Sequence, residues 1–286
     1  MHIPQQLLHG NICPVTLTVG ALGVLAAGYG CRKTNDNVSP ARWAGITALI
    51  FSLQMLNFPV TNGTSGHLIG GVLAASLLGI PRAILSIAMV LLTQALFFAD
   101  GGLDALGANI INMGLIGAGL GGVLLSVLKK KGISNNQAIA TASIVSILAA
   151  AFACTLEVSL SGSIAFGKMF KAMMPVHGLI GIGEAVITVS LIALLARLGA
   201  GTLVAGALLL SPFASSLPDG LDWTMQQLNL AALESPSLLA WFRDYQLAGI
   251  QHPAISTITA GLIGALCVWG FTMVIAKQVR MAYDQN

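Results

Sequence analysis

Charged residues are scarce in this sequence. They make up 8% of the 286 residues, whereas 56% are hydrophobic. Soluble domains carry about 25% charged residues, so the composition excludes an ordinary soluble protein. Cysteines are also few, and none forms a CxxC pair, which argues against a disulfide framework or a thiolate metal site. The sequence further lacks an HExxH motif, a Walker sequence and any signal for nucleic-acid binding, so its own residues offer neither a metalloprotease centre nor an ATPase.

Long apolar runs without period-2 alternation predict an all-α polytopic membrane protein, a helical bundle rather than a barrel. We expect about nine transmembrane helices, over residues 12–30, 43–58, 67–80, 83–99, 108–128, 137–156, 177–196, 199–216 and 256–278.

The few charges separate by sign between alternate loops. One set of loops is basic and includes Arg32, Lys33, Lys129, Lys130 and Arg197. The other set carries most of the carboxylates. The positive-inside rule then predicts a multi-pass protein of the cell inner (cytoplasmic) membrane with its N-terminus outside. The acidic outer face would concentrate cations.

The first residues lack the basic region and cleavage site of a signal peptide, so we expect the chain to start at Met1, on the outer face. The amine of Met1, the backbone nitrogen of His2 and its Nδ1 can close two fused chelate rings. His67, in a polar glycine-rich hairpin on the same face, could fill the fourth position. Four in-plane nitrogens are typical of Ni(II) and Cu(II) sites. The sequence therefore predicts a metal site at Met1, His2 and His67.

Simpler interpretations of these residues stay open. A chain start is usually disordered, and a single histidine at a helix start often only caps or packs. His177 and Glu184 share one helix face, and Glu184 can serve either as a structural hydrogen-bond partner or in coupling.

Several motifs together resemble the CbiM/NikM family, the metal-binding membrane subunits of energy-coupling factor (ECF) transporters for nickel and cobalt. They are MHIP at residues 1–4, QMLNFPV at 54–60, GTSGHL at 63–68, QAL at 94–96, DGGL at 100–103, LGAN at 106–109, NM at 112–113 and HGLIGIGE at 177–184. The sequence PDGLD at residues 218–222 resembles the PDGLE module, which is akin to the companion subunits CbiN and NikN. We therefore expect a metal-binding membrane core over residues 1–198 and a PDGLE module, with an outer loop and a final transmembrane helix, over residues 199–286.

The resemblance implies a substrate-binding subunit of an ATP-driven importer, which holds the ion at Met1, His2 and His67. Ni²⁺ is the favoured substrate and Co²⁺ the next, with no prosthetic group. An ECF ATPase pair and a transmembrane coupling (T) subunit would be the partners and would hydrolyse ATP, so the chain itself is not expected to be an enzyme. Two departures from the family are Gln5-Gln6 after MHIP, and Asp222 for the usual glutamate. The alternative is a self-sufficient secondary transporter or channel for divalent cations, which would need intramembrane carboxylates along a path; only Glu184 is clearly expected inside. A membrane metalloenzyme ranks last.

Overall fold

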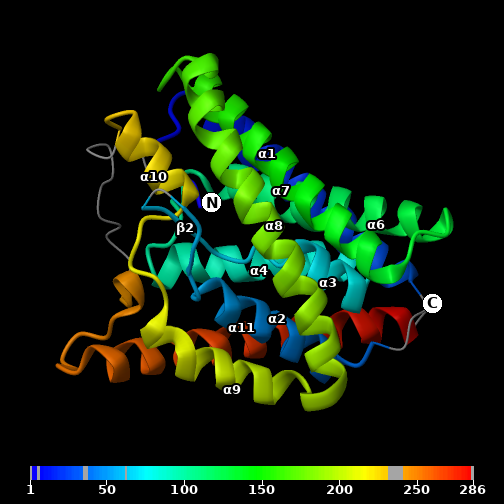
Figure 1. The fold of residues 1–286 in the computed structure, drawn as a ribbon. Coiled ribbons are helices and arrows are strands. Elements are labelled where there is room, and N and C mark those ends of the chain that lie inside the picture. The colour runs from blue at the N-terminus through cyan, green and yellow to red at the C-terminus, as the bar shows by residue number, and fades with distance from the viewer. Residues whose placement is uncertain (1, 5–6, 35–37, 62, 231–240, 285–286) are drawn as a thin grey trace.

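The computed structural model describes residues 2–4, 7–34, 38–61, 63–230 and 241–284, and almost all of its regular structure is helical (Figure 1). In chain order the elements are α1 (Ile12–Lys33), α2 (Pro40–Gln54), β1 (Phe58–Pro59), β2 (Ser65–Gly66), α3 (Gly71–Leu78), α4 (Ile80–Phe97), α5 (Leu106–Asn109), the π-helix η1 (Ile110–Leu120), α6 (Gly121–Lys130), α7 (Asn135–Leu160), α8 (Phe166–Leu198), α9 (Ala200–Leu210), the 3₁₀-helix η2 (Ser211–Phe213), α10 (Gly220–Gln227), the 3₁₀-helix η4 (Arg243–Tyr245) and α11 (Pro253–Asp284).

Six helical segments in the described part of the chain are long and apolar enough to cross a membrane. They are Ile12–Lys33, Ile80–Phe97, Leu106–Lys130, Asn135–Leu160, Phe166–Leu198 and Pro253–Met281. The predicted helical character is thus confirmed, but the count of nine spans is not. The other three apolar runs form α2, α3 and α9, with 15, 8 and 11 residues, fewer than the roughly 20 that a span needs. α3 is short because Gly70 and Gly79, which have positive φ, turn the backbone at both of its ends.

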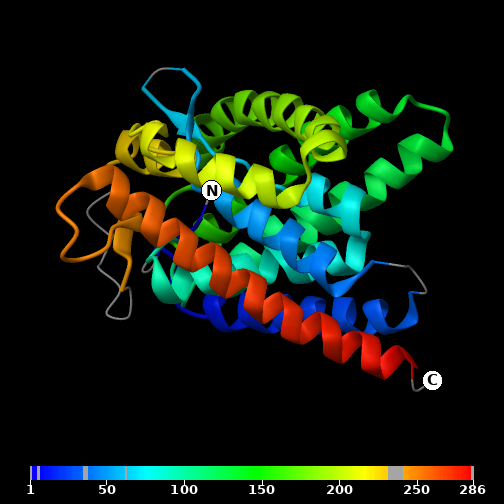
Figure 2. The same cartoon turned by 90° about the horizontal axis from the view of Figure 1, so that it is seen from below.

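The helices pack closely at positions without side chains. α7 packs along α8, and α11 packs along α2, as Figure 2 shows for the latter pair. Between α3 and η1, a Cβ on Gly71 would lie 2.4 Å from the carbonyl carbon of Gly117. Small residues commonly allow such close approach between membrane helices, where the packing itself provides much of the attraction.

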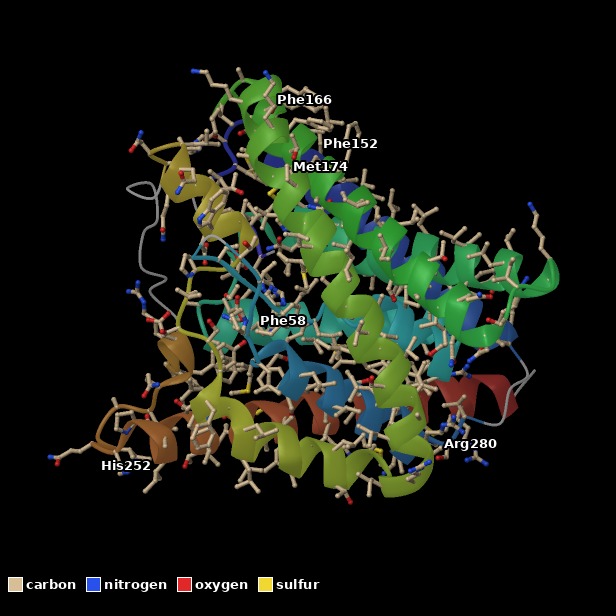
Figure 3. The ribbon with its side chains drawn as sticks, in the orientation of Figure 1. Phe58, Phe152, Phe166, Met174, His252 and Arg280 are labelled. Carbon is tan, nitrogen blue, oxygen red and sulfur yellow. The ribbon has the colours of Figure 1, made fainter. Side chains whose placement is uncertain are left out.

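The hairpin, α10 and the start of α11 gather at one end of the bundle, and the connection between α6 and α7 lies at the other end together with the end of α11 (Figures 1 and 2). In the hairpin, Phe58 pairs with Gly66 and Pro59 with Ser65. Phe58, labelled in Figure 3, packs its ring against α8 at Gly183, where a Cβ would lie 2.6 Å from Cε2 of that ring. The hairpin is therefore held against the bundle.

Candidate metal centre

A cavity of about 250 Å³ lies at the hairpin end of the bundle. Its walls come from the N-terminal segment, the end of α2, the hairpin region, the end of α4, the start of α10 and η4. The lining residues are His2, Pro4, Gln54, Met55, Asn57, His67, Phe98, Ala99, Asp100, Gly101, Asp219, Asp222, Asp244 and Tyr245. Four of these are aspartates, so the cavity attracts cations.

The structure brings together the two histidines that the sequence singled out. The ring centroids of His2 and His67 lie 5.0 Å apart, and their planes differ by 15°. Both side chains are buried, with exposed fractions of 7% and 6%. Met1, the third predicted site residue, lies outside the described residues.

The segment that carries His2 is anchored to the end of α5 and to the loop after α4. The backbone nitrogen of Ile3 donates to Oδ1 of Asn109 at 2.8 Å, and Nδ2 of Asn109 donates back to the carbonyl of Ile3 at 3.2 Å. The backbone nitrogen of Gly102 donates to the same carbonyl at 2.9 Å. Gly101 must be a glycine here, since its φ is +85° and a Cβ would meet Nδ2 of Asn109 at 3.0 Å.

The ring of His2 has an oxygen near each nitrogen. Nδ1 lies 3.0 Å from Oδ1 of Asp100, and Nε2 lies 3.2 Å from Oε1 of Gln94. Burial lowers the pKa of His2 to about 4, although the carboxylate of Asp100 acts in the opposite direction. The imidazole is therefore neutral at pH 7, and one of its nitrogens carries a lone pair that can bind a metal ion.

His67 follows the hairpin directly and is positioned by a buried carboxylate of α8. Oε2 and Oε1 of Glu184 accept hydrogen bonds from the backbone nitrogens of Ile69 and Gly70, at 2.6 and 2.8 Å. Nε2 of Gln54 donates to the carbonyl of Ile69 at 2.9 Å. Glu184 thus has the structural hydrogen-bonding role that was one of its two sequence interpretations.

The segment before α10 is hydrogen-bonded to the hairpin and to the residue before it. The backbone nitrogen of Ser65 donates to the carbonyl of Pro218 at 2.8 Å, and that of Ser215 donates to the carbonyl of Asn57, also at 2.8 Å. This docking places Oδ2 of Asp219 3.5 Å from Nε2 of His67. The C-terminal part of the chain therefore reaches the predicted site.

A second contact from the C-terminal part is made by Tyr245. Its hydroxyl donates to Oδ2 of Asp100 at 2.7 Å and accepts from Nε2 of Gln94 at 3.1 Å. Burial, together with Asp100, raises the pKa of Tyr245 well above its usual value, so the phenol stays protonated and remains a donor. His2, Asp100, Tyr245 and Gln94 form a closed polar ring.

Sequence reasoning did not assign a role to Gln94, Asp100, Asp219 or Tyr245. The first three lie in motifs that carry the family resemblance, and this could have marked them. Tyr245 lies in no such motif, and nothing in its sequence context points to the site.

His177, which the sequence analysis placed on the same helix face as Glu184, is buried in α8. It lies next to the start of α10. Its Nδ1 lies 2.9 Å from the carbonyl of Met173, while Nε2 has no hydrogen-bond partner. Gly220 packs directly onto this ring. The structure thus places His177 beneath α10 and not in the cavity that holds His2.

Among the described residues, no group of three or more His, Cys, Asp or Glu side chains is already arranged to hold a metal ion. The predicted chelate includes only two side chains, those of His2 and His67, and its other donors belong to the chain start. The remaining donors of the predicted site would be the N-terminal amine and the backbone nitrogen of His2.

The sequence profile of the CbiM family, described as "cobalt uptake substrate-specific transmembrane region", matches residues 2–202. The chain belongs to the CbiM family. A second profile, that of the PDGLE domain, matches residues 193–281 of this CbiM-family protein. The resemblance drawn from the sequence motifs is therefore confirmed.

Relatives of this CbiM-family chain are named as metal transport proteins. One from Archaeoglobus fulgidus, with the provisional name fused nickel transport protein NikMN, is 29% identical over 99% of this chain and all of the relative. The fused nickel transport protein NikMN of Rhodobacter capsulatus is 36% identical over 41% of this chain and 34% of its own length. The cobalt transport protein CbiM of Sorangium cellulosum is 35% identical over 57% of this chain and 76% of its own length.

Two solved structures share the fold. The crystal structure of a truncated transition metal transporter is 31% identical, with a TM-score of 0.62 over 69% of this chain and 99% of that one. A second transition metal transporter gives the same identity and TM-score over 93% of its chain. With the six long apolar helices of its described part, the CbiM-family chain is a multi-pass membrane protein of a nickel and cobalt transport family.

Proposed function

We propose that this chain is the substrate-binding membrane subunit of an ECF-type importer that captures Ni²⁺, or Co²⁺ as second choice, for ATP-driven uptake. One observation carries the proposal. The buried imidazoles of His2 and His67, far apart in the sequence, have centroids 5.0 Å apart in a cavity lined by aspartates. Imidazoles beside carboxylates favour a divalent transition metal over an anion or an apolar ligand.

The donors would be the amine of Met1, the backbone nitrogen and Nδ1 of His2, and Nε2 of His67. The neutral state of His2 supports this set, because metal binding needs an unprotonated nitrogen. When Nδ1 binds the ion, the proton moves to Nε2, which already lies 3.2 Å from Oε1 of Gln94. Gln94 would then orient the ring, as outer partners of metal-binding histidines commonly do.

The two parts of the chain would have different roles in metal capture. The core, residues 1–198, would hold most of the site, and the PDGLE module, residues 199–286, would cover it from outside. The chain would lie in the cell inner (cytoplasmic) membrane with its N-terminus outside. Energy would come from an ECF ATPase pair through a coupling (T) subunit, since the sequence has no Walker motif.

Metal content of the protein purified from cells supplied with nickel, cobalt and copper tests the substrate. We expect stoichiometric nickel, and near-complete loss of tight binding in His2→Ala, in His67→Ala and after acetylation of the N-terminus. The matched control is His252→Ala, because His252 is exposed and lies apart from the cavity.

Normal affinity in either His2→Ala or His67→Ala would remove that residue from the metal shell. Uptake by cells that produce this chain without a partner ATPase would contradict the importer role and favour a secondary transporter or channel.

A further inference from the structure

We propose that Tyr245, a residue of the PDGLE module, positions the metal-binding imidazole of His2 by fixing the orientation of the Gln94 amide that lies between them. This inference rests on the function proposed above, and it gives the module a role in the geometry of the metal site. Tyr245 does not bind the ion and acts only through Gln94.

The proposed chelate needs a hydrogen-bond acceptor at Nε2 of His2. When Nδ1 binds the ion, the one proton of the neutral ring lies on Nε2, which becomes a donor. Oδ1 of Asp100, 3.0 Å from Nδ1, instead favours a proton on Nδ1, so the acceptor at Nε2 has to balance it. Oε1 of Gln94, 3.2 Å from Nε2, is that acceptor. The NH₂ group of the same amide only donates, so Gln94 orients the ring only when its oxygen faces His2.

Tyr245 determines which end of the Gln94 amide faces His2. The phenol has a single proton and donates it to Oδ2 of Asp100 at 2.7 Å, because a carboxylate only accepts. The phenol oxygen is then an acceptor, and Nε2 of Gln94 donates to it at 3.1 Å. With its NH₂ group bound to Tyr245, Gln94 presents its oxygen on the other side, toward His2.

Burial of Gln94 makes this control effective. Its side chain is fully buried in α4, so bulk water does not compete for the amide. A turned amide would set its oxygen against the phenol oxygen of Tyr245, with no proton left between the two acceptors. Leaving buried polar groups without partners is unfavourable, so the contacts of the wild type favour a single orientation.

Contacts with the core hold the hydroxyl of Tyr245 in place. The backbone nitrogen of Asp244 donates to the carbonyl of Phe98 at 3.3 Å, just after the helix that carries Gln94. The ring of Tyr245 stacks on Phe98, with centroids 4.7 Å apart. Asp244 and Tyr245 both have positive φ, 53° and 57°, a strained conformation for residues other than glycine that persists only where surrounding contacts enforce it.

Tyr245→Phe tests the proposal, because it removes the hydroxyl and keeps the ring that stacks on Phe98. We expect the Ni²⁺ affinity of the purified full chain to fall roughly tenfold in isothermal titration, the lower end of the effect of partners that orient metal-binding histidines. The Ni²⁺ absorption spectrum at saturation should keep its wild-type form, since the metal ligands are unchanged. The matched control is Tyr29→Phe, which removes an exposed hydroxyl from α1 and should bind like the wild type.

A second variant asks whether the effect passes through Gln94. Gln94→Met keeps the length of the side chain and removes the amide, so it should weaken Ni²⁺ binding at least as much as Tyr245→Phe. In the double variant the loss of the hydroxyl should then have little further effect, because no amide remains to be oriented. A role of Tyr245 in docking alone would instead give additive losses.

Three results would overturn the proposal: wild-type affinity in Tyr245→Phe or in Gln94→Met, additive losses in the double variant, or a changed spectrum in Tyr245→Phe, which would mean that the ligand set itself depends on the hydroxyl. Absence of Ni²⁺ binding by the wild type would refute the proposed function, which distinguishes the two failures.

Discussion

At the scale of single residues, Glu184 determines where His67 lies without touching it. Its two oxygens hold consecutive backbone nitrogens immediately after His67, and the side chain is 1% exposed. Burial of a carboxylate is costly unless it is hydrogen-bonded, so the two bonds explain how it can stay in the bundle. The same two bonds fix the backbone from which His67 projects.

Glu184→Gln should weaken metal binding by loosening the backbone that positions His67. Glutamine offers one acceptor oxygen and two N–H donors, so one of the two backbone nitrogens loses its partner, at about 1–3 kcal/mol. We expect a lower thermal unfolding temperature in detergent and weaker Ni²⁺ binding, but a smaller loss than in His67→Ala. Isothermal titration and thermal unfolding of the same samples measure both.

Glu157→Gln is the matched control. Glu157 is buried in α7 and accepts from Nδ2 of Asn112 at 2.6 Å, away from the hairpin backbone. The Glu157→Gln variant should be less stable than the wild type without a comparable loss of Ni²⁺ affinity. Equal losses of affinity in the two variants would show that Glu184 acts only through general stability.

At the scale of elements, the short helix α10 attaches the PDGLE module to the core. Pro218 accepts from the hairpin, Asp219 faces His67, and Gly220 packs on α8, where a Cβ would lie 2.7 Å from Cδ1 of Ile180 and 2.8 Å from Cε1 of His177. Leu221 is fully buried. The PDGL motif is therefore a docking motif in which each residue has its own contact.

Gly220→Ala should loosen this docking. Alanine favours a helix over glycine by up to about 1 kcal/mol, but an added methyl group in a packed contact costs about 1–3 kcal/mol. The His177 ring cannot easily yield, because its Nδ1 is held by Met173. We expect Ni²⁺ to bind several-fold more weakly in equilibrium titration.

Gly206→Ala in α9 is the control, since nothing lies within 4 Å of a Cβ there. It should leave binding unchanged and stability equal or slightly higher. Unchanged Ni²⁺ affinity in Gly220→Ala would mean that metal binding does not depend on this close contact between α10 and α8.

The elements show which part of the site was predictable. The apolar runs predicted helices, and the helix breakers Pro59 and Gly66 predicted the hairpin, because helices and turns depend on local sequence. The prediction that His2 and His67 would meet came from their expected location on the same face of the membrane. Asp219 and Tyr245 could not be placed, because they reach the cavity through docking between distant segments. The predicted count of nine spans is not confirmed, because α2, α3 and α9 are apolar but shorter than a typical span.

At the scale of the whole molecule, the cavity and the basic helix ends occupy opposite ends of the bundle. Arg32 and Lys33 end α1, Lys130 ends α6 and Arg197 lies in the last turn of α8. These ends lie near the end of α11, where Figure 3 labels Arg280, and away from the hairpin (Figure 1). This asymmetry supports the proposed orientation, because basic residues favour the cytoplasmic side.

Single cysteines in a variant without the four native ones test that orientation. Thr61 lies in the hairpin and Lys130 at the end of α6, and both are exposed. With the cavity outside, a membrane-impermeant maleimide should label Thr61→Cys in intact spheroplasts, and Lys130→Cys only after permeabilisation. The reverse pattern would place the imidazoles of His2 and His67 on the cytoplasmic side, where they could release an ion but not capture one from outside.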